Sequence, residues 1–333
     1  MKKRLLLILF SFVSSWMFCE QFSVLYFNVW SGLSGEGLIT SESYEQPGAH
    51  DFRYELLIDG LKAYQPSFAG LSELNPLPKM VKGIEDETKL IGIPFGENGG
   101  LRIGIAGLPY NLYSGSSLFG IKETAIEKSG TARLSGSFTG DMFYAGSSRK
   151  VLICRASLAG KEIFIALTNW SEGLYADETN FRLLVNQNTS GSLDDDELLE
   201  AMETSMAMQK RRISEAQGTI DYINKIAGQA PVILMGTLSC APESEEYQLL
   251  MKAGFKDAWG GGAGATWDER TNTNIQAQDI DLYRAGASSD RVDYILYRGG
   301  GLRVLSSRLV FNHPTYSTYP SDHYGILSRF SIQ

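Results

Sequence analysis

Short apolar runs alternate with amphipathic stretches along almost the whole chain. The first run, residues 22–30, is rich in β-branched and aromatic side chains and leads into Ser31-Gly32, as a strand does where it meets a loop. Residues 67–74 repeat this pattern and lead into Asn75-Pro76. Runs of this kind predict strands at residues 22–30, 67–74, 101–105, 150–155, 162–167, 231–236, 291–297, 302–310 and 324–332.

Helical periodicity marks several of the segments between these runs. In residues 51–64 leucines recur on one face, Asp51 can cap the first turn, and Pro66 stands just beyond the end. Similar signals predict helices at 79–90, 194–226 and 244–253, with a break at Gly218 in the long one. The polar stretch 175–192 has no period and is expected to be a surface loop.

No linker rich in Pro or Gly, no repeat and no change of composition divides the chain after residue 19. This predicts one α/β domain over residues 20–333, with mostly antiparallel strand pairing and long loops at the strand ends.

The first nineteen residues have a different character. Lys2, Lys3 and Arg4 form a basic start, and residues 5–18 carry no charge, a run too short for an ordinary transmembrane helix. This pattern predicts a signal peptide over residues 1–19 and an extracytoplasmic protein, either periplasmic or secreted. A lipid anchor at Cys19 is disfavoured because the bulky Phe18 precedes it.

The charge of the chain narrows the choice of partners. Removal of residues 1–19 takes three positive charges from a formal net charge of −8, which leaves about −11. Such a surface repels polyanions, so nucleic acid is a disfavoured partner. The three histidines and three cysteines do not form a cluster with zinc spacing. Cys154 and Cys240 leave two alternatives open, one disulfide or two buried thiols.

Polar residues that could carry chemistry fall where predicted strands begin or end, which is where α/β architectures place their sites. They are Asn28, Glu73, Asp293, Asp322 and His323. Each of them alone is as easily explained as a cap or a structural hydrogen-bond partner.

Their order and context change this interpretation. Five segments resemble, in the correct order, the motifs of the endonuclease/exonuclease/phosphatase superfamily, which includes DNase I-like nucleases, inositol phosphatases and sphingomyelinases. The segments are Leu25-Tyr-Phe-Asn-Val-Trp30, Gly70-Leu-Ser-Glu-Leu74, Pro231-Val-Ile-Leu-Met-Gly236, Asp290-Arg-Val-Asp-Tyr-Ile-Leu296 and Ser321-Asp-His-Tyr-Gly325. The resemblance covers essentially all of residues 21–333.

The resemblance implies a DNase I-like α/β fold, a four-layer sandwich of two mixed β-sheets packed face to face with helices outside. It implies that Glu73, helped by Asn28, holds Mg²⁺ or Mn²⁺. His323 would act on an attacking water or stabilise phosphoryl oxygens, and Asp293 would orient its imidazole. Asp322 would lie beside the metal or the water.

The chain departs from the family pattern at three positions. Where the family has an aspartate and, two residues later, an asparagine, this chain has Thr237 and Ser239. Thr237 cannot become a carboxylate, and Ser239 is too short to replace an asparagine amide. A histidine found in many members on a middle strand is replaced by Asn169. Losing a positioned acid or base costs about 10²- to 10⁴-fold in rate, so a loss of several decades is expected.

Two hypotheses therefore compete. The first is a catalytically impaired, exported and monomeric family member that binds a phosphorylated small molecule or phospholipid headgroup, a divalent metal or a protein partner. The second is an active Mg²⁺-dependent phosphodiester or phosphomonoester hydrolase in which another carboxylate, such as Glu243 or Asp257, reaches the position of Thr237. The segment Thr266-Trp267-Asp268, with Asn272, favours the sphingomyelinase-like branch. Whether any carboxylate lies next to Thr237 and within reach of His323 separates the two hypotheses best.

Overall fold

The protein was analysed as a computed structural model, which describes residues 20–32, 48–98, 101–103, 106–108, 114–136, 148–158, 160–173, 175–260, 264–276 and 289–333. The predicted signal peptide, residues 1–19, lies outside the described residues, so its boundary stays a prediction. In the described part of the chain, no helix is long and apolar enough to cross a membrane.

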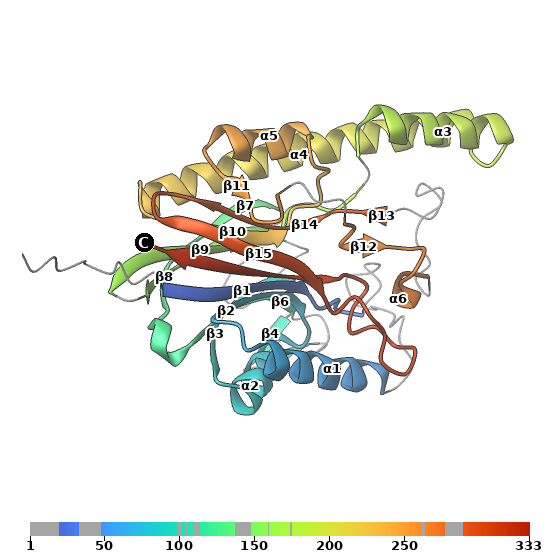
Figure 1. The fold of residues 1–333 in the computed structure, drawn as a ribbon. Coiled ribbons are helices and arrows are strands. Elements are labelled where there is room, and N and C mark those ends of the chain that lie inside the picture. The colour runs from blue at the N-terminus through green and yellow to red at the C-terminus, as the bar shows by residue number, and fades with distance from the viewer. Residues whose placement is uncertain are drawn as a thin grey trace, which may run out of the picture.

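The first of two central sheets has six strands in the order β15-β16-β1-β2-β6-β3 (Figure 1). Its strands are β1 (Glu20–Asn28), β2 (Phe68–Leu74), β3 (Leu90–Asn98), β6 (Ser114–Ile121), β15 (Leu302–Val310) and β16 (Gly325–Ile332). β1 and β2 are parallel, and every other neighbouring pair is antiparallel. β1 therefore lies beside the last strand of the chain, with Glu20 opposite Ile332.

The second sheet repeats this plan, in the order β11-β14-β10-β9-β8-β7. Its strands are β7 (Glu127–Gly136), β8 (Ser148–Leu158), β9 (Lys161–Thr168), β10 (Val232–Thr237), β11 (Lys256–Asp257) and β14 (Asp293–Arg298). Its one parallel pair is β9 with β10. Two-stranded ribbons are formed by β4 (Leu101–Ile103) with β5 (Ala106–Leu108), and by β12 (Trp267–Asp268) with β13 (Ser289–Asp290).

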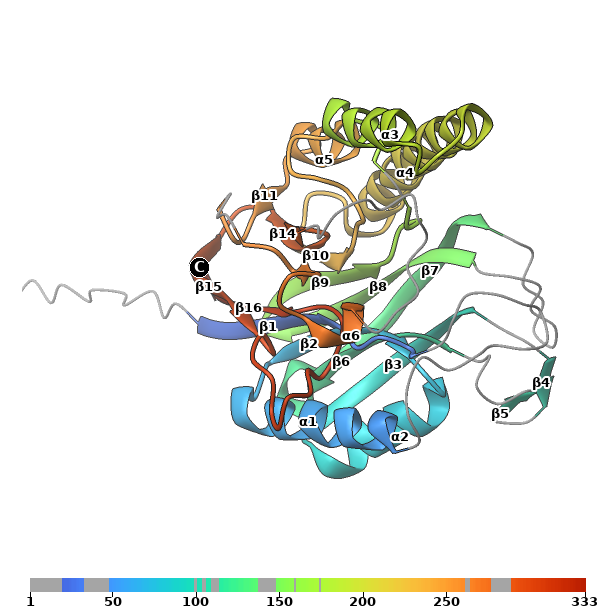
Figure 2. The same cartoon turned by 90° about the vertical axis from the view of Figure 1, so that its right-hand side faces the viewer.

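Helices cover the outer faces of both sheets (Figures 1 and 2). α1 (Ala49–Tyr64) and α2 (Leu77–Glu87) lie on the first sheet, while α4 (Asp195–Ala227) and α5 (Glu245–Lys252) lie on the second. α3 (Glu178–Ser190) packs on α4, and α6 (Thr273–Gln276) is a short helix near β12. The expected architecture, two mixed sheets packed face to face with helices outside, is confirmed.

Strand alternation divides the apolar residues between three cores. In β1, Val24 and Tyr26 face the core between the sheets, whereas Leu25 and Phe27 face α1 and α2. A third core lies between the second sheet and helices α4 and α5. The two sheets thus share a dry interior, and polar groups gather at its end.

The cysteines lie in different cores and are free. Cys154 is buried between the sheets, and Cys240 is buried under α5. Burial raises the pKa of each thiol to about 12. Of the two alternatives, the structure therefore has two buried thiols.

Some predicted elements differ from the structure. Residues 178–190, expected in a loop, form α3, which the sequence hid because Leu184 is the single buried residue of this surface helix. Its ends follow ordinary capping chemistry: Asp177 accepts from the Asn180 backbone N–H, and Gly191 closes the helix in the left-handed conformation. α4 continues through Gly218, where the missing side chain leaves room for Leu134.

The prediction from the sequence also misplaced the start of one helix and missed three of the long strands. α1 begins at Ala49 after Gly48, so Asp51 belongs to the first turn and is not the cap. β3, β6 and β7 were not predicted, and their sequences contain Gly and Ser where a strand pattern expects apolar residues.

A buried ion pair joins α4 to α5. Arg212 Nε lies 3.0 Å from Glu246 Oε1, and both side chains are at most 1% exposed. Removing one partner would leave the other charge buried and unpaired, so we expect Glu246→Ala to lower the free energy of unfolding by about 3 kcal/mol or more. Chemical denaturation would measure this.

The exposed pair of Arg155 with Glu127 provides the matched control. Glu127→Ala should cost less than about 1 kcal/mol. Equal losses for the two substitutions would contradict this account of α4 and α5.

Candidate functional site

The polar residues chosen from the sequence lie at one end of the sandwich. Asn28 is the last residue of β1, and Glu73 lies near the end of β2. Because β1 and β2 are parallel, these two strand ends lie at the same end of the sheet. Thr237 ends β10, and it is paired with Asp293 at the start of the antiparallel β14. His323 lies just before β16, the other neighbour of β1.

His323 and Asp293 form a buried ion pair. Nδ1 of His323 lies 2.7 Å from Oδ2 of Asp293, and both side chains are buried. Burial opposes a charge on the imidazole, but the carboxylates of Asp293 and Asp322 outweigh it and raise the pKa of His323 to about 10. The ring is therefore a cation at neutral pH, which suits it to bind an anion and not to remove a proton from water.

Thr237 is built into this pair. Its hydroxyl donates to Oδ1 of Asp293 at 2.7 Å, so Asp293 holds His323 with one oxygen and Thr237 with the other. With its proton directed at Asp293, the Thr237 hydroxyl accepts from the Asn28 amide at 3.4 Å, and it lies 2.7 Å from the Tyr26 hydroxyl, whose single proton it shares with Asn169. The carboxylate next to Thr237 is thus the one that already orients His323.

Tyr26 links the two sheets at the base of the site. Its hydroxyl lies 2.7 Å from the Ser72 hydroxyl in the first sheet and donates to Oδ1 of Asn169, at 2.9 Å, beyond β9 in the second. Burial, together with the charge of Asp293, raises the pKa of this phenol well above its ordinary value. Tyr26 therefore stays neutral.

Asn28 and Glu73 form the other half of the site. The Asn28 amide nitrogen donates to Oε1 of Glu73 at 2.8 Å and lies 3.4 Å from Nε2 of His323. The Asn28 amide oxygen accepts from the Trp30 backbone N–H at 3.0 Å, and the Ser31 N–H donates to Oε2 of Glu73 at 3.1 Å. The two side chains are held against each other by the loop that follows β1.

The backbone is strained at this end of the sheets. Trp30, Glu73 and Ser239 all have left-handed conformations, with φ of 58°, 57° and 47°. Such residues cost of order 1–3 kcal/mol each and cluster at functional sites, where the surroundings hold them in place. Ser239 is fixed by its backbone N–H, which donates to the Val292 carbonyl at 3.2 Å.

Glu73 lies among other carboxylates. Burial raises its pKa, and the charges of Glu172 and Asp322 raise it further. Asp322 is itself buried and accepts from the Ser321 hydroxyl at 3.1 Å. The sequence did not suggest Glu172, because a single Glu in a loop carries no signal. The uncompensated negative charge at Glu73 would favour a bound cation.

Asn169, in the place of the histidine, has a buried carboxyl as its partner. Its amide nitrogen donates to Oε2 of Glu97 at 3.0 Å, and the Ser116 hydroxyl donates to the same oxygen. Burial raises the pKa of Glu97 to about 7. Its other oxygen, Oε1, is buried without a hydrogen-bond partner. No motif marks Glu97, which ends the unpredicted strand β3.

Arg149 brings a second cation to this end. It lies near the start of β8, one residue before Lys150, whose carbonyl accepts from the Thr168 hydroxyl at the end of β9. Its guanidinium is 3.1 Å from Oε1 of Glu172. Burial opposes the charge of Arg149, but nearby carboxylates, Glu172 first among them, raise its pKa.

The two carboxylates considered as substitutes for the missing aspartate have other roles. Asp257 is bound by Arg291, with a closest contact of 2.6 Å, and both side chains are nearly buried. Glu243 is exposed after the loop that follows β10. Neither is a hydrogen-bond partner of Thr237.

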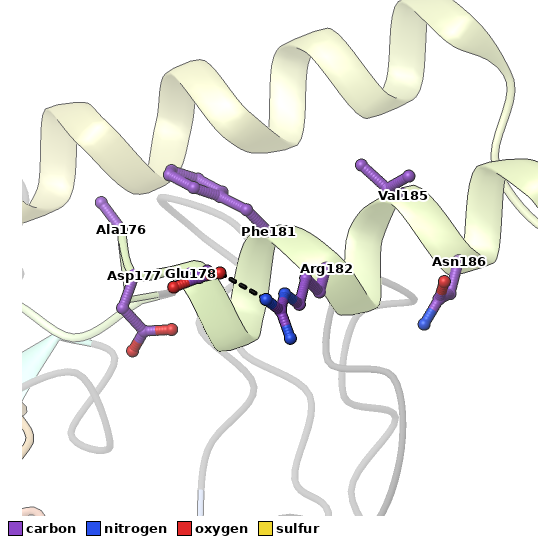
Figure 3. A pocket seen from close by; sticks show the side chains of 7 residues that line it. All are labelled: Ala176, Asp177, Glu178, Phe181, Arg182, Val185 and Asn186. Atoms are coloured by element: carbon purple, nitrogen blue, oxygen red, sulfur yellow. Dashed lines mark hydrogen bonds and ion pairs between the residues drawn. The ribbon is translucent and has the colours of Figure 1, made fainter.

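A groove of about 530 Å³ runs along α3, and Figure 3 shows the side chains that line it. Its charged residues include Glu178 and Arg182, which form an ion pair with each other. None of the residues predicted to carry chemistry lines it. The convergence of polar groups at the strand ends is therefore the better candidate site.

Solved structures of low sequence identity share this arrangement. The endonuclease/exonuclease/phosphatase from Bacteroides vulgatus has a TM-score of 0.62 at 15% identity, and the match covers 94% of this chain and 100% of that chain. The chain has the endonuclease/exonuclease/phosphatase fold. A family protein from Bacteroides thetaiotaomicron matches with a TM-score of 0.62 at 14% identity, over 95% of this chain and 99% of that one.

A third match is TDP2 from D. rerio complexed with a single strand DNA product, with a TM-score of 0.58 and 16% identity over 93% and 98% of the two chains. No family model matches the sequence. No curated protein matches it either. The fold predicted from the endonuclease/exonuclease/phosphatase motifs is confirmed, whereas the sphingomyelinase-like branch stays a prediction.

The pKa of His323 predicts how stability depends on pH. In the folded protein it is raised to about 10, above the value of about 6.5 expected in the unfolded chain. The stabilisation by the pair is thus complete below about pH 6.5 and is lost as the pH rises towards 10. Measured unfolding free energies of wild type and His323→Gln should converge over this range. A difference that is constant with pH would contradict a charged His323.

Proposed function

We propose that this chain is an exported, catalytically impaired member of the endonuclease/exonuclease/phosphatase family that binds a phosphorylated ligand together with a divalent metal ion. One observation carries the proposal: the hydroxyl of Thr237 donates to Asp293, which is also the partner of His323. The position of the family's catalytic aspartate is therefore occupied by a group that cannot take a proton from water.

Two cations support the binding of a phosphate. His323 is charged at neutral pH and is fixed by Asp293, and Arg149 lies near the same end of the second sheet. Charge-assisted hydrogen bonds from such groups are about twice as strong as neutral ones, and a guanidinium matches two phosphate oxygens at once. A phosphate could take the place of Glu172 at Arg149.

The metal would be Mg²⁺ or Mn²⁺, held by Glu73 with Asp322 or Glu172. Among the described residues, no three His, Cys, Asp or Glu side chains are grouped closely enough to hold an ion by themselves. This suits Mg²⁺, which keeps several waters and is usually bound by one or two carboxylates plus ligand phosphate. Asn28 would fix the Glu73 carboxylate, to which it donates. The ion would neutralise charge on the phosphate.

The expected ligand is a phosphorylated small molecule or a phospholipid headgroup, bound by a monomer outside the cytoplasm. The net charge of about −11 after removal of residues 1–19 disfavours nucleic acid. The DNA product in the D. rerio structure belongs to that protein and is not carried over to this one.

One feature favours the alternative of an active hydrolase. Glu97 has a pKa of about 7 and a buried oxygen without a partner. A carboxyl with this pKa is suited to general acid or base catalysis near neutral pH. If wild type hydrolyses phosphodiesters and Glu97→Gln removes that activity, Glu97 takes over the role of the missing aspartate.

Metal binding can be tested by calorimetry with Mn²⁺ and Mg²⁺. We expect weak binding to wild type that Glu73→Ala abolishes, because Glu73 is the proposed ligand and the charges of Glu172 and Asp322 near it favour a cation. Glu243→Ala, at an exposed carboxylate that does not contact Thr237, is the control and should leave binding unchanged. Absence of heat with wild type would remove the metal from the proposal.

Catalysis can be tested by restoring the family residues. Wild type should be silent towards an aryl phosphodiester and sphingomyelin with Mg²⁺. Thr237→Asp with Ser239→Asn should raise hydrolysis at least about tenfold, or about 1.4 kcal/mol of transition-state stabilisation. The structure adds one condition: the new carboxylate would lie close to Asp293, so the gain should increase above the pH at which both are ionised.

The control for this experiment is the same double variant with His323→Gln, which should be silent again. Robust turnover by wild type would contradict impairment directly. No gain in the double variant would count, less directly, against the idea that Thr237 and Ser239 alone silence the site.

A further inference from the structure

The segment from residue 264 to residue 276, which contains β12 and α6, holds no residue assigned above to ligand binding. It is nevertheless attached to both of the closing motifs, residues 290–296 and 321–325. Two of its polar residues, Thr266 and Asn272, are completely buried. Completely buried polar side chains in a surface excursion call for a structural or functional reason.

Thr266 holds the start of β14. Its hydroxyl accepts from the backbone N–H groups of Val292 and Asp293, both at 3.0 Å. Its own N–H donates to the Asp290 carbonyl at 3.0 Å, and its carbonyl accepts from the Tyr324 N–H. A single residue thus contacts the backbone of Asp293 and of the residue that follows His323.

Asn272 holds the backbone before His323. Its amide nitrogen donates to the carbonyls of Ser321 and Asp322, at 2.9 and 3.0 Å. The hydrogen bond from the Tyr324 N–H to the Thr266 carbonyl belongs to an isolated antiparallel β-bridge that places Trp267 opposite His323. The segment therefore forms hydrogen bonds to the backbone before and after His323 and to the backbone of Asp293. His323 precedes a strand of the first sheet, and Asp293 begins a strand of the second.

We propose that Thr266 and Asn272 are positioning residues that set the geometry of the His323–Asp293 pair for the ligand. The inference rests on the proposed function, in which His323 binds a phosphate. Asp293 starts a strand of the second sheet, whereas His323 precedes a strand of the first. Their 2.7 Å contact consequently depends on the relative position of the starts of β14 and β16, and the segment 264–276 connects these two strand starts by hydrogen bonds.

Three variants test this. Thr266→Val keeps the shape of the side chain but removes the acceptor of two buried N–H groups, whereas Thr266→Ser keeps the hydroxyl. Asn272→Asp keeps the shape but removes the donor to two carbonyls. Thr219→Val is the matched control. Thr219 lies in α4 and is as buried as Thr266, and its hydroxyl accepts from the Trp170 indole N–H at 3.2 Å.

Two measurements should be made on each variant of the full chain. Calorimetry with Mn²⁺ and inorganic phosphate gives the affinity, and the ring ¹⁵N chemical shifts of His323 report its hydrogen bond to Asp293 without any ligand. At metal sites, mutation of the residues that orient the ligands typically costs about 10- to 100-fold in affinity or activity, and we take the lower end of this range as the effect on a positioned His323. We therefore expect Thr266→Val and Asn272→Asp to weaken phosphate at least about tenfold and to shift the His323 signals. Thr266→Ser and Thr219→Val should resemble wild type in both.

The outcomes separate this inference from the proposed function. If wild type binds phosphate, His323→Gln abolishes binding, and Thr266→Val changes neither affinity nor shifts, the positioning role is wrong. If Thr219→Val has the same effects as Thr266→Val, the role is one of general stability and the proposal is likewise overturned. If wild type binds no phosphate, the proposed function fails, while the His323 shifts still decide whether Thr266 positions the ring.

Discussion

The site depends on one constraint: polar groups enclosed between the two sheets must satisfy one another, because water does not reach them. The Tyr26 hydroxyl stands where the sheets meet, between Ser72 on one side and Thr237 and Asn169 on the other. The single proton of Tyr26 is shared between the Asn169 amide oxygen and the Thr237 hydroxyl, and the Ser72 hydroxyl can donate to the Tyr26 oxygen. Each group in this chain of contacts fixes the direction in which the next can donate.

This constraint explains why the departures from the family pattern occur together. A threonine at position 237 can accept from Tyr26 and donate to Asp293, a combination that an ionised carboxylate does not offer. Asn169 can accept from Tyr26 and from the Thr237 backbone while it donates to Glu97. These hydrogen bonds connect the two sheets and rigidify the site, although one oxygen of Glu97 stays without a partner. The replacements therefore form one consistent arrangement, and Asp293 with His323 remains intact at its end.

Local pattern was sufficient for much of this structure. The ends of β1, β2, β10, β14 and β16 could be read from apolar runs and their flanking residues, and these ends carry the site. Tyr26, Glu97, Arg149 and Glu172 could not be found in that way. In the alternating pattern of its strand, Tyr26 looks like an ordinary core residue, and the partners of its hydroxyl lie 46, 143 and 211 positions away in the sequence. Glu97 lies near the end of β3, and Gly92, Pro94 and Gly96 in the same strand are residues that strand propensity disfavours. The role of a residue whose partners are distant in the sequence cannot be predicted from the residues next to it.

The pairing of β1 with β16 has a consequence for the order in which the molecule can be assembled. β1 is an inner, apolar strand of its sheet, yet β16, the strand on one of its sides, is synthesised after the other strands of both central sheets. Until then β1 has an open edge of unpaired N–H and C=O groups, which is the kind of surface on which chains associate wrongly. A chain that ends before residue 325 would keep that edge permanently, since β16 also joins β15 to the sheet. Synthesis must therefore reach β16 before β1 is protected on that side, and the closing motif with His323 is completed in the same step.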